Sequence, residues 1–136
     1  MTNRTVTTQP RTIYSDFPIS FSVHPEKKDL SLVTNDNAVK QSIRNLLLTD
    51  RFERVFQPTV GSNIRSMLFE QITNDTAITL RTLVIETITI FEPRAKLQLV
   101  RVTPDEQKQS YIVSIVFTTT TITQPTQLIV TLNRVR

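Results

Sequence analysis

The sequence predicts an α+β fold in which three helices pack on a small antiparallel sheet. In the middle of the 136-residue chain, apolar residues recur every three or four positions, the period of an amphipathic helix. In the last third they alternate with polar residues, the period of a half-buried strand. Because two polar turns join three such alternating segments, we expect an antiparallel meander against which the three helices can pack.

The length of the chain suits one domain with a real core. The stretch Met1 to Arg11 is polar and has no apolar periodicity. We therefore predict a flexible tail at residues 1–12 and a single domain at residues 13–136.

An alternating pattern runs from Ile13 to Val33 and places Ile19, Phe21 and Val23 on one face. This pattern is typical of a half-buried strand. The polar residues and the proline at 24–29 interrupt it, so we expect two short extended segments around a turn.

The first helix is expected from about Asp36 to Thr49, after the capping candidates Thr34 and Asn35. Its apolar face consists of Val39, Ile43, Leu46 and Leu47.

The second helix is expected after Gly61, the only glycine of the chain. This glycine has two interpretations. Either it takes a conformation, or allows a close approach, that a Cβ would oppose, or it belongs to an ordinary turn with Ser62 as the N-cap. The apolar face of the helix is expected to contain Ile64, Met67, Leu68 and Ile72, with Phe69 at its edge.

The third helix is expected from Ala77 to Phe91, after the capping signal Asn74-Asp75. Many of its residues are β-branched and lower its helix propensity. The apolar period, together with Pro93, which disfavours helix at the preceding residue, nevertheless favours a helix.

Three strands are expected after Pro93. They run from Ala95 to Thr103, across the alternating residues Tyr111 to Phe117, and from Gln127 to Arg134. In the last strand Leu128, Val130 and Leu132 are predicted to face inward.

The composition argues against several functions. The net charge of +4 comes from basic residues scattered along the whole chain, so we expect a solvated surface and no nucleic-acid partner. With no cysteine, one histidine and one glycine, a thiolate or histidine metal cluster and a glycine-rich phosphate loop are excluded, and no cofactor or metal is expected. No apolar run is long enough for a membrane span, and no signal-peptide core is evident, so neither membrane insertion nor conventional secretion is expected.

Catalytic residues are not evident either. A glycosidase needs two carboxylates across a cleft, and nothing in the spacing of the acidic residues brings two of them together. We therefore expect no catalytic residue and no enzyme. The acidic residues considered are Glu53, Glu70, Glu86, Glu92, Asp105 and Glu106.

The sequence Glu92-Pro93-Arg94, between the third helix and the first long strand, resembles the Glu-Pro-Arg signature of the phage baseplate-wedge family, historically called "tail lysozyme" and related to type VI secretion baseplate subunits. The resemblance extends in order from about Tyr14 to Arg136. It includes Asp29 to Val33 with the helix Ala38 to Thr49, and a Phe-x-Pro-x-x-Gly stretch leading into a Leu-Phe-Glu helix at Phe56, Pro58, Gly61, Leu68, Phe69 and Glu70.

The resemblance implies a structural role in the tail baseplate of a virion made in the host cytoplasm. It implies a fold similar to the interlocking domain of contractile sheath proteins. The expected partners are other wedge subunits and the tail sheath protein, within a large symmetric hetero-oligomer whose sheath this subunit nucleates. The alternative is a peptidoglycan-degrading tail lysozyme.

Two sets of residues are expected to carry the assembly. We expect Glu92, Pro93 and Arg94 to form an interaction motif whose ion pair matters more to assembly than to the isolated fold; the alternative is an ordinary helix stop with exposed charges. We also expect the strand with Leu128, Val130 and Leu132 to pair with a neighbouring chain. The alternative is a central strand with both edges already paired.

Overall fold

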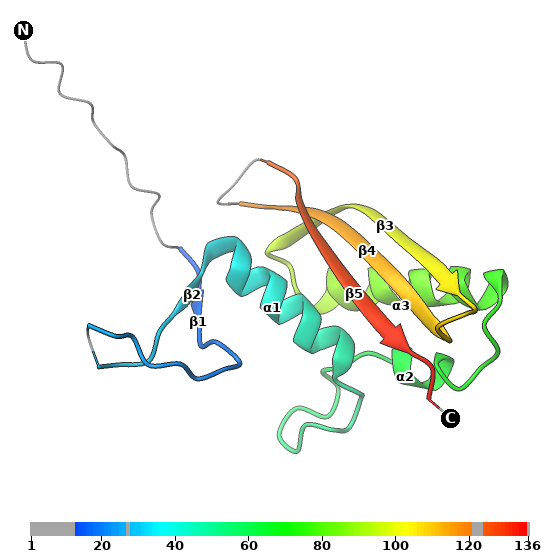
Figure 1. Cartoon of the computed structure of the whole chain (residues 1–136), viewed down its shortest axis with the longest axis horizontal. Helices are drawn as coiled ribbons and strands as arrows, with labels where there is room; N and C mark the ends of the chain where they lie inside the picture. The colour runs from blue at the N-terminus through cyan, green and yellow to red at the C-terminus, as the bar shows by residue number, and fades with distance from the viewer. Residues whose placement is uncertain (1–12, 27, 121–123, 136) are drawn as a thin grey trace, which may run out of the picture.

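The computed structural model describes residues 13–26, 28–120 and 124–135 (Figure 1). The expected tail at residues 1–12 lies outside the described residues. In chain order the elements are β1 (Ser15–Asp16), β2 (Val33–Thr34), α1 (Asn35–Leu48), α2 (Ile64–Met67), α3 (Asn74–Phe91), β3 (Ala95–Asp105), β4 (Ser110–Thr119) and β5 (Thr126–Asn133).

The fold has two layers. The antiparallel sheet has the order β3-β4-β5, and the helices lie against one of its faces, with α3 behind β3 and α1 beside β5 (Figure 1). The predicted α+β fold is confirmed. The chain order of the strands equals their order in the sheet, so β3 and β5 form its two edges.

The register of the sheet determines which side chains face the helices and which face away from them. Val113 of β4 lies opposite Val102 of β3 and Val130 of β5, and all three point toward the helices. Alternate residues such as Ile112 and Ile129 lie on the other face and are partly exposed. The fully buried side chains of the core are Val39, Ile43, Ile64, Leu80, Val84, Ile88, Tyr111, Val113, Ile115 and Phe117.

Polar contacts fix the start of α1 against the sheet. The Asp36 carboxylate accepts hydrogen bonds from the hydroxyls of Thr119, at 2.7 Å, and Thr126, at 3.1 Å. These threonines are at the end of β4 and the start of β5. One side chain in the first turn of the helix therefore joins two adjacent strands.

The threonine-rich helix α3 forms as predicted. Thr73 caps it, since its hydroxyl accepts from the backbone N–H of Thr76. Within the helix, the hydroxyls of Thr79, Thr82 and Thr89 donate to the carbonyls four residues earlier. These bonds satisfy the polar atoms of the β-branched residues inside the helix, while the apolar face is buried.

The predicted second helix is wrong in length, because α2 ends at Met67. The backbone N–H groups of Leu68, Phe69 and Glu70 each donate to the carbonyl three residues earlier, as in a tightened turn. Leu68 is still buried and Ile72 packs against the core. The apolar residues after Met67 therefore contact the core from an irregular segment, although their spacing resembles that of a helix.

The prediction that one face of residues 13–33 is half-buried is wrong. The two expected short extended segments do form, since Ser15–Asp16 pairs with Val33–Thr34 and Val23 pairs with Leu30 in an antiparallel bridge. Ile19, Phe21 and Val23 are 63%, 65% and 62% exposed. Phe21 has a φ of 45°, which interrupts an extended strand, and the segment beyond it is hydrogen-bonded mainly to itself. The two-stranded sheet β1-β2 is too short to cover these apolar side chains, which therefore stay exposed. We refer to residues 13–33 as the N-terminal arm.

Gly61 lies where the chain returns to the end of α1. Its φ is +152°, and a Cβ built on it would be 2.6 Å from the carbonyl oxygen of Asp50 and 2.8 Å from the backbone nitrogen of Arg51. Next to it, the buried Ser62 donates its hydroxyl to the carbonyl of Leu47 at 2.9 Å. The first interpretation of the glycine, close approach in a conformation that opposes a Cβ, is the one that the structure supports.

We predict that Gly61→Val lowers the free energy of unfolding by more than about 2 kcal/mol, because the new side chain is both strained and in collision with backbone. Ser62→Ala should cost only about 0.5 to 1.5 kcal/mol, the usual value of one hydrogen bond. Urea unfolding of the two variants and the parent provides the measurement. Equal stability of Gly61→Val and the parent would contradict the close approach.

Candidate functional site

The Glu-Pro-Arg segment turns the chain from α3 into β3. Glu92 is the C-cap of α3, and its backbone N–H still donates to Ile88 at 2.8 Å. Pro93 cannot continue the helix, and the N–H of Ala95 then donates to the carbonyl of Glu92 at 3.1 Å. The carboxylate and the guanidinium that flank the proline are thereby held on the same side of a tight corner.

The Glu92 side chain is only 3% exposed and is fully bonded inside the chain. Arg94 donates to it twice, from Nε to Oε1 at 2.5 Å and from a terminal nitrogen to Oε2 at 2.8 Å. Ser42, on α1, donates its hydroxyl to Oε2. The guanidinium carbon of Arg94 also lies 5.3 Å from the centre of the Tyr14 ring. One carboxylate thus joins α1, the end of α3 and the start of β3, and its partner arginine contacts the N-terminal arm.

The electrostatics of the pair follow from this geometry. Burial by itself would raise the pKa of Glu92, but the hydrogen bonds from Arg94 and Ser42 and the positive charge of Arg94 outweigh it and lower the pKa below its usual range. The hydrogen bond to Glu92 raises the pKa of Arg94. The pair is therefore ionised at neutral pH.

The alternative of an ordinary helix stop with exposed charges does not fit Glu92, because its carboxylate is buried and bonded within its own chain. The pair therefore also contributes to the isolated fold, and its role in assembly stays a prediction. Arg94 is 35% exposed and retains a surface from which another molecule can be contacted.

A cleft of about 380 Å³ opens beside this corner. It lies between the arm, α1, the end of α3 and the loop that follows α1. A second hollow continues from it along the arm, sharing Asp16 and Asn45. The cleft is lined by Asp16, Ser42, Asn45, Leu46, Arg54, Gln57, Val60 and Phe91.

The strand residues of the expected pairing site lie at an edge. Val130 and Leu132 are buried and Leu128 is half-buried, all on the helix side of β5. Because β5 has only β4 as a neighbour among the described strands, the alternative of a central strand is wrong.

The other expected motif residues divide into buried and exposed ones. Gly61 and Leu68 are buried, and the Pro58 carbonyl accepts from the N–H of Phe52 at 2.9 Å. Phe56 is 97% exposed, Phe69 is 56% exposed, and Glu70 is exposed. Phe56 therefore adds nothing to the packing of its own chain.

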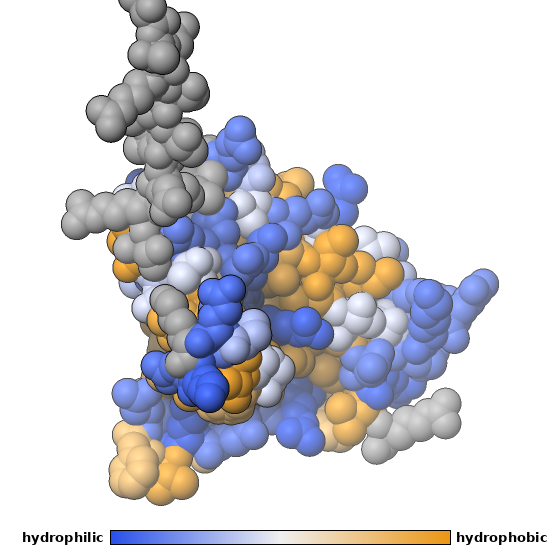
Figure 2. Space-filling model, turned by 60° about the vertical axis from the view of Figure 1, so that its left-hand side comes forward, coloured by the Kyte–Doolittle hydropathy of each residue, from blue (hydrophilic) through white to orange (hydrophobic). Residues whose placement is uncertain are grey.

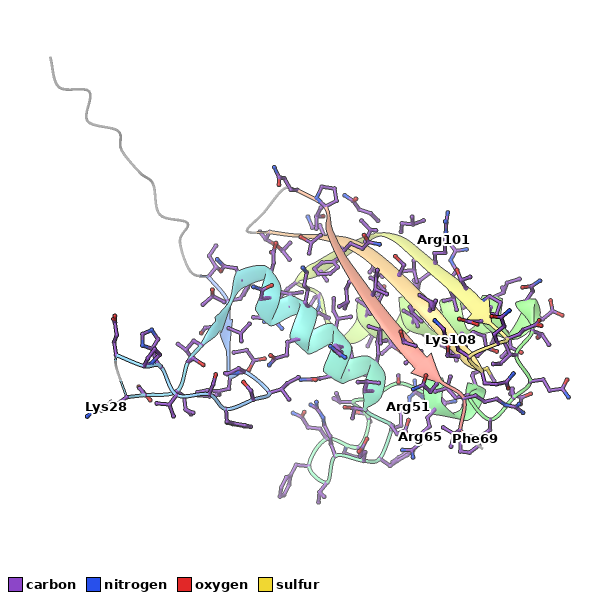
Figure 3. All side chains as sticks on the ribbon, viewed as in Figure 1. Lys28, Arg51, Arg65, Phe69, Arg101 and Lys108 are labelled. Carbon is purple, nitrogen blue, oxygen red and sulfur yellow. The ribbon has the colours of Figure 1, made fainter. Side chains whose placement is uncertain are left out.

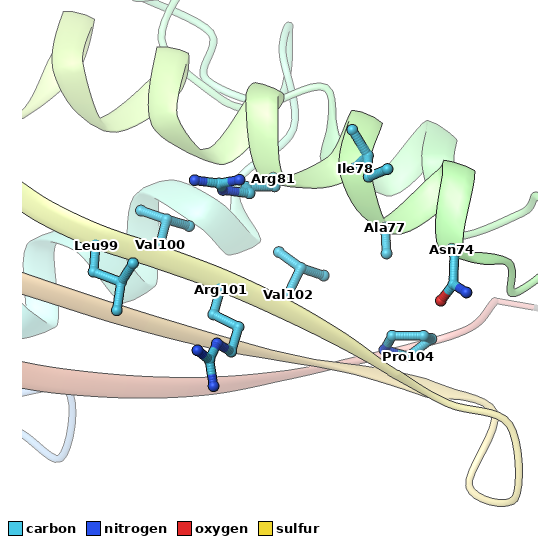
Figure 4. Close-up of a pocket in the computed structure, with 9 residues that line it drawn as sticks. All are labelled: Asn74, Ala77, Ile78, Arg81, Leu99, Val100, Arg101, Val102 and Pro104. Atoms are coloured by element: carbon cyan, nitrogen blue, oxygen red, sulfur yellow. The ribbon is translucent and has the colours of Figure 1, made fainter.

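A further groove lies between α3 and β3 (Figure 4). Its lining combines apolar side chains with Asn74, Arg81 and Arg101, and contains no carboxylate and no histidine. It thus offers no acid or base for hydrolysis.

The charged residues do not gather into an evident site. Figure 3 shows Lys28 in the arm, Arg51 and Arg65 below the end of α1, Arg101 on β3, and Lys108 near the turn between β3 and β4. Within the described residues, no group of three acidic or histidine side chains could hold a metal ion. No described helix has the length and hydropathy needed to cross a membrane.

Comparison with known proteins decides the family. The profile of the baseplate wedge protein gp25 matches residues 33–125, more than half of the chain. The chain belongs to this family. The matched residues include the Glu-Pro-Arg corner and the cleft residues on α1, the following loop and α3. The resemblance to a baseplate-wedge family is confirmed.

Solved structures similar to this gp25 family member include the following two. A candidate tail lysozyme from Geobacter sulfurreducens has a TM-score of 0.72 and 25% identity, and the match covers 79% of this chain and 97% of that chain. A chain in the cryo-EM structure of the anti-feeding prophage baseplate, solved with six-fold symmetry, has a TM-score of 0.62 and 24% identity, over 90% of this chain and 87% of that chain. The second likeness shows the shared fold. No curated protein matches the chain.

Sequence reasoning missed Ser42 and Tyr14. Ser42 lies on α1, 50 positions before Glu92, and Tyr14 belongs to the arm. Neither residue type signals such a contact, because serine and tyrosine are common on surfaces. Only the packing of α1 against the end of α3 brings them to the corner.

We predict that Arg94→Ala destabilises the isolated gp25-like domain by about 3 kcal/mol at neutral pH, because it leaves a buried carboxylate without its partner. This is the lower end of the usual range, since water can enter the space of the partly exposed arginine. Glu92→Gln should cost about 1.5 to 3 kcal/mol, the value of a hydrogen bond to a charged group. Urea unfolding checks both values, and parental stability of Arg94→Ala would contradict the pair's role in the fold.

The contribution of Glu92 should also depend on pH. Because its folded pKa is lowered, the stabilisation is complete above the usual carboxyl pKa of about 4.3 and is lost as the pH falls through the folded value. The difference in unfolding free energy between parent and Glu92→Gln should therefore be constant near pH 7 and shrink below about pH 4. A difference that grows on acidification would have the wrong sign.

Proposed function

We propose that this protein is a non-enzymatic structural subunit of the baseplate of a contractile tail, where it packs against neighbouring wedge subunits and starts the sheath by strand pairing. Membership of the gp25 family supports the baseplate role. The similar chain in a six-fold baseplate supports a place in a large symmetric hetero-oligomer. The finer roles rest on the free surfaces of the chain.

The open edge of β5 is the main support for the proposed role in starting the sheath. Among the described strands only β4 pairs with it. The strand Thr126–Asn133 contains no charged residue and no proline, although proteins usually protect a free edge with such residues. An incoming strand could therefore form main-chain hydrogen bonds along it, while Val130 and Leu132 keep the edge anchored to the core.

The N-terminal arm supports packing against wedge neighbours. Its side chains Ile13, Phe17, Ile19, Phe21, Val23 and Leu32 are 53% to 65% exposed. Figure 2 shows that apolar side chains gather in separate exposed groups on one face of the molecule. Exposed apolar groups of this kind are typical of surfaces that a partner covers.

Peptidoglycan hydrolysis is the second candidate, because one similar structure bears the name of a tail lysozyme. A hydrolase needs a carboxylic acid with a raised pKa beside a second carboxylate. Glu92 has a lowered pKa and its oxygens are occupied by Arg94 and Ser42. The assembly role is therefore favoured.

We predict that β5 forms main-chain hydrogen bonds with a strand of a neighbouring chain, the sheath protein, in the assembled tail. Electron cryomicroscopy of the particle provides the measurement. If no neighbouring strand lies along β5, strand exchange at this edge is wrong and docking depends on other surfaces.

A variant pair tests the same edge in solution. Leu128→Lys places a charge on the inward side of β5, which should block strand addition while the lysine stem stays on the apolar surface. Gln127→Lys is the control, because it places the same charge on the exposed side of the same strand. We expect both proteins to fold and only Leu128→Lys to fail in sheath assembly, scored by counting sheathed tails.

We also predict that the purified protein leaves cell walls intact, because no pair of carboxylates is arranged as acid and nucleophile or base. A turbidity assay on a peptidoglycan suspension measures this. Clearing that is lost in Glu70→Gln, an exposed carboxylate, would instead support hydrolysis.

A further inference from the structure

Backbone contacts join the two ends of the loop between α1 and α2. The backbone N–H of Ser62 donates to the carbonyl of Thr49 at 2.9 Å, and Asp50 pairs with Ser62 in a parallel bridge. The Ser62 hydroxyl also binds the end of α1, and Gly61 brings the two backbones together. The loop 50–62 therefore projects from a fixed base, below the end of α1 in Figure 1.

The tip of this loop presents three large apolar side chains to solvent. Phe52, Val55 and Phe56 are 80%, 86% and 97% exposed, more than the apolar residues of the arm. We call these three residues the apolar knob. Burying side chains of this size contributes about 1.5 to 3 kcal/mol each, so a protein that holds them in water gives up a large stabilisation. None of the described residues covers them.

The knob is held by bonds within the loop. The N–H of Phe52 donates to Pro58 at 2.9 Å, that of Gln57 to Arg54 at 3.3 Å, and that of Val60 to Gln57 at 3.1 Å. Phe52 has a φ of 68°, a region that bulky residues rarely adopt. Such a conformation persists where the surroundings impose it, and it is common in segments that bind a partner. A knob ordered in advance loses less conformational entropy on binding.

Charges around the knob favour an acidic partner. Arg51 and Arg54 are exposed beside it. The only acidic residue of the tip, Glu53, instead turns its carboxylate to the N–H of Asp50 at 2.9 Å, at the base of the loop. The tip thus combines apolar side chains with two exposed guanidinium groups, which bind carboxylates well.

The loop also borders the cleft beside the Glu-Pro-Arg corner, because Arg54, Gln57 and Val60 line that cleft. On its other side, Phe52 and Phe69 lie along a hollow of about 510 Å³ with Arg51 and Arg65. The loop that carries the knob therefore borders two separate hollows. Three side chains are too few for a stable interface by themselves, but they suit the central anchor of a larger one.

We propose that the apolar knob inserts into an apolar pocket, rimmed by carboxylates, on a different protein subunit of the baseplate. This inference rests on the proposed baseplate role, and it names a contact distinct from the pairing of β5. The partner is identified by its chemistry: a pocket that accepts two phenylalanine rings and acidic groups that meet Arg51 and Arg54.

Incorporation into particles tests the proposal. Tagged Phe56→Ser protein is expressed together with untagged parent, and the ratio of the two is measured in purified tails. We expect the ratio to fall at least about tenfold, the effect of losing one anchor residue of an interface. Ile78→Ser is the control, because Ile78 is 64% exposed on α3 and lies away from the loop. The folding of each variant is checked by urea unfolding, where Phe56→Ser should equal the parent.

A cross-linking experiment identifies the partner chemistry. Phe56 is replaced by the photoreactive p-benzoylphenylalanine, assembled particles are irradiated, and the linked peptides are sequenced by mass spectrometry. Attachment to one subunit, at apolar residues flanked by Asp or Glu, supports the proposal. Attachment to lipid or to a second copy of this chain overturns it.

The outcomes separate this inference from the proposed function. If the parent protein is missing from purified tails, the baseplate role itself fails. If the parent is present and Phe56→Ser is incorporated at the parental ratio, the baseplate role stands and the knob contact is wrong.

Discussion

The buried carboxylate of Glu92 is the interaction on which the arrangement of this fold depends. It lies where α3 ends and β3 begins, and it accepts from Arg94 in its own corner and from Ser42 on α1. A carboxylate is costly to bury unless charged and polar donors satisfy it. The corner is therefore stable only when α1 lies against the end of α3. Through Arg94 and Tyr14, the start of the N-terminal arm is fixed to the same point.

Two further contacts fix α1 to the rest of the chain. At its start, Asp36 joins the ends of β4 and β5, and at its end, Ser62 and Gly61 close the loop 50–62. The cleft beside the Glu-Pro-Arg corner thus lies between elements that are each held by polar bonds. This rigidity is what a subunit needs if its surfaces must meet several partners in a fixed geometry.

The surfaces proposed for assembly share one property: each has main-chain groups or apolar side chains that the described part of the chain leaves unpaired or exposed. The edge of β5 has main-chain groups without a described strand neighbour, the arm exposes apolar side chains, and the knob exposes two phenylalanine rings, one of them on a residue with a positive φ. A monomer gains nothing from these features. In an assembly with strands and pockets supplied by other subunits, each becomes a source of binding free energy.

The sequence by itself determined the long helices, the three long strands and the resemblance to the family. The helical period defines α1 and α3, the alternation defines β3, β4 and β5, and the lone Gly61 signals a special backbone position, because these signals act over a few residues. The tertiary structure alone decided that Glu92 is buried, that residues 68–72 pack without a helix, and that the arm and Phe56 are exposed. Each of these outcomes depends on which distant segment packs against the residue. Ser42, for example, contacts Glu92 although the two are 50 positions apart in the sequence. Apolar alternation shows which side chains share a face, but only the packing of the whole chain decides whether that face is covered by its own core or left for a partner.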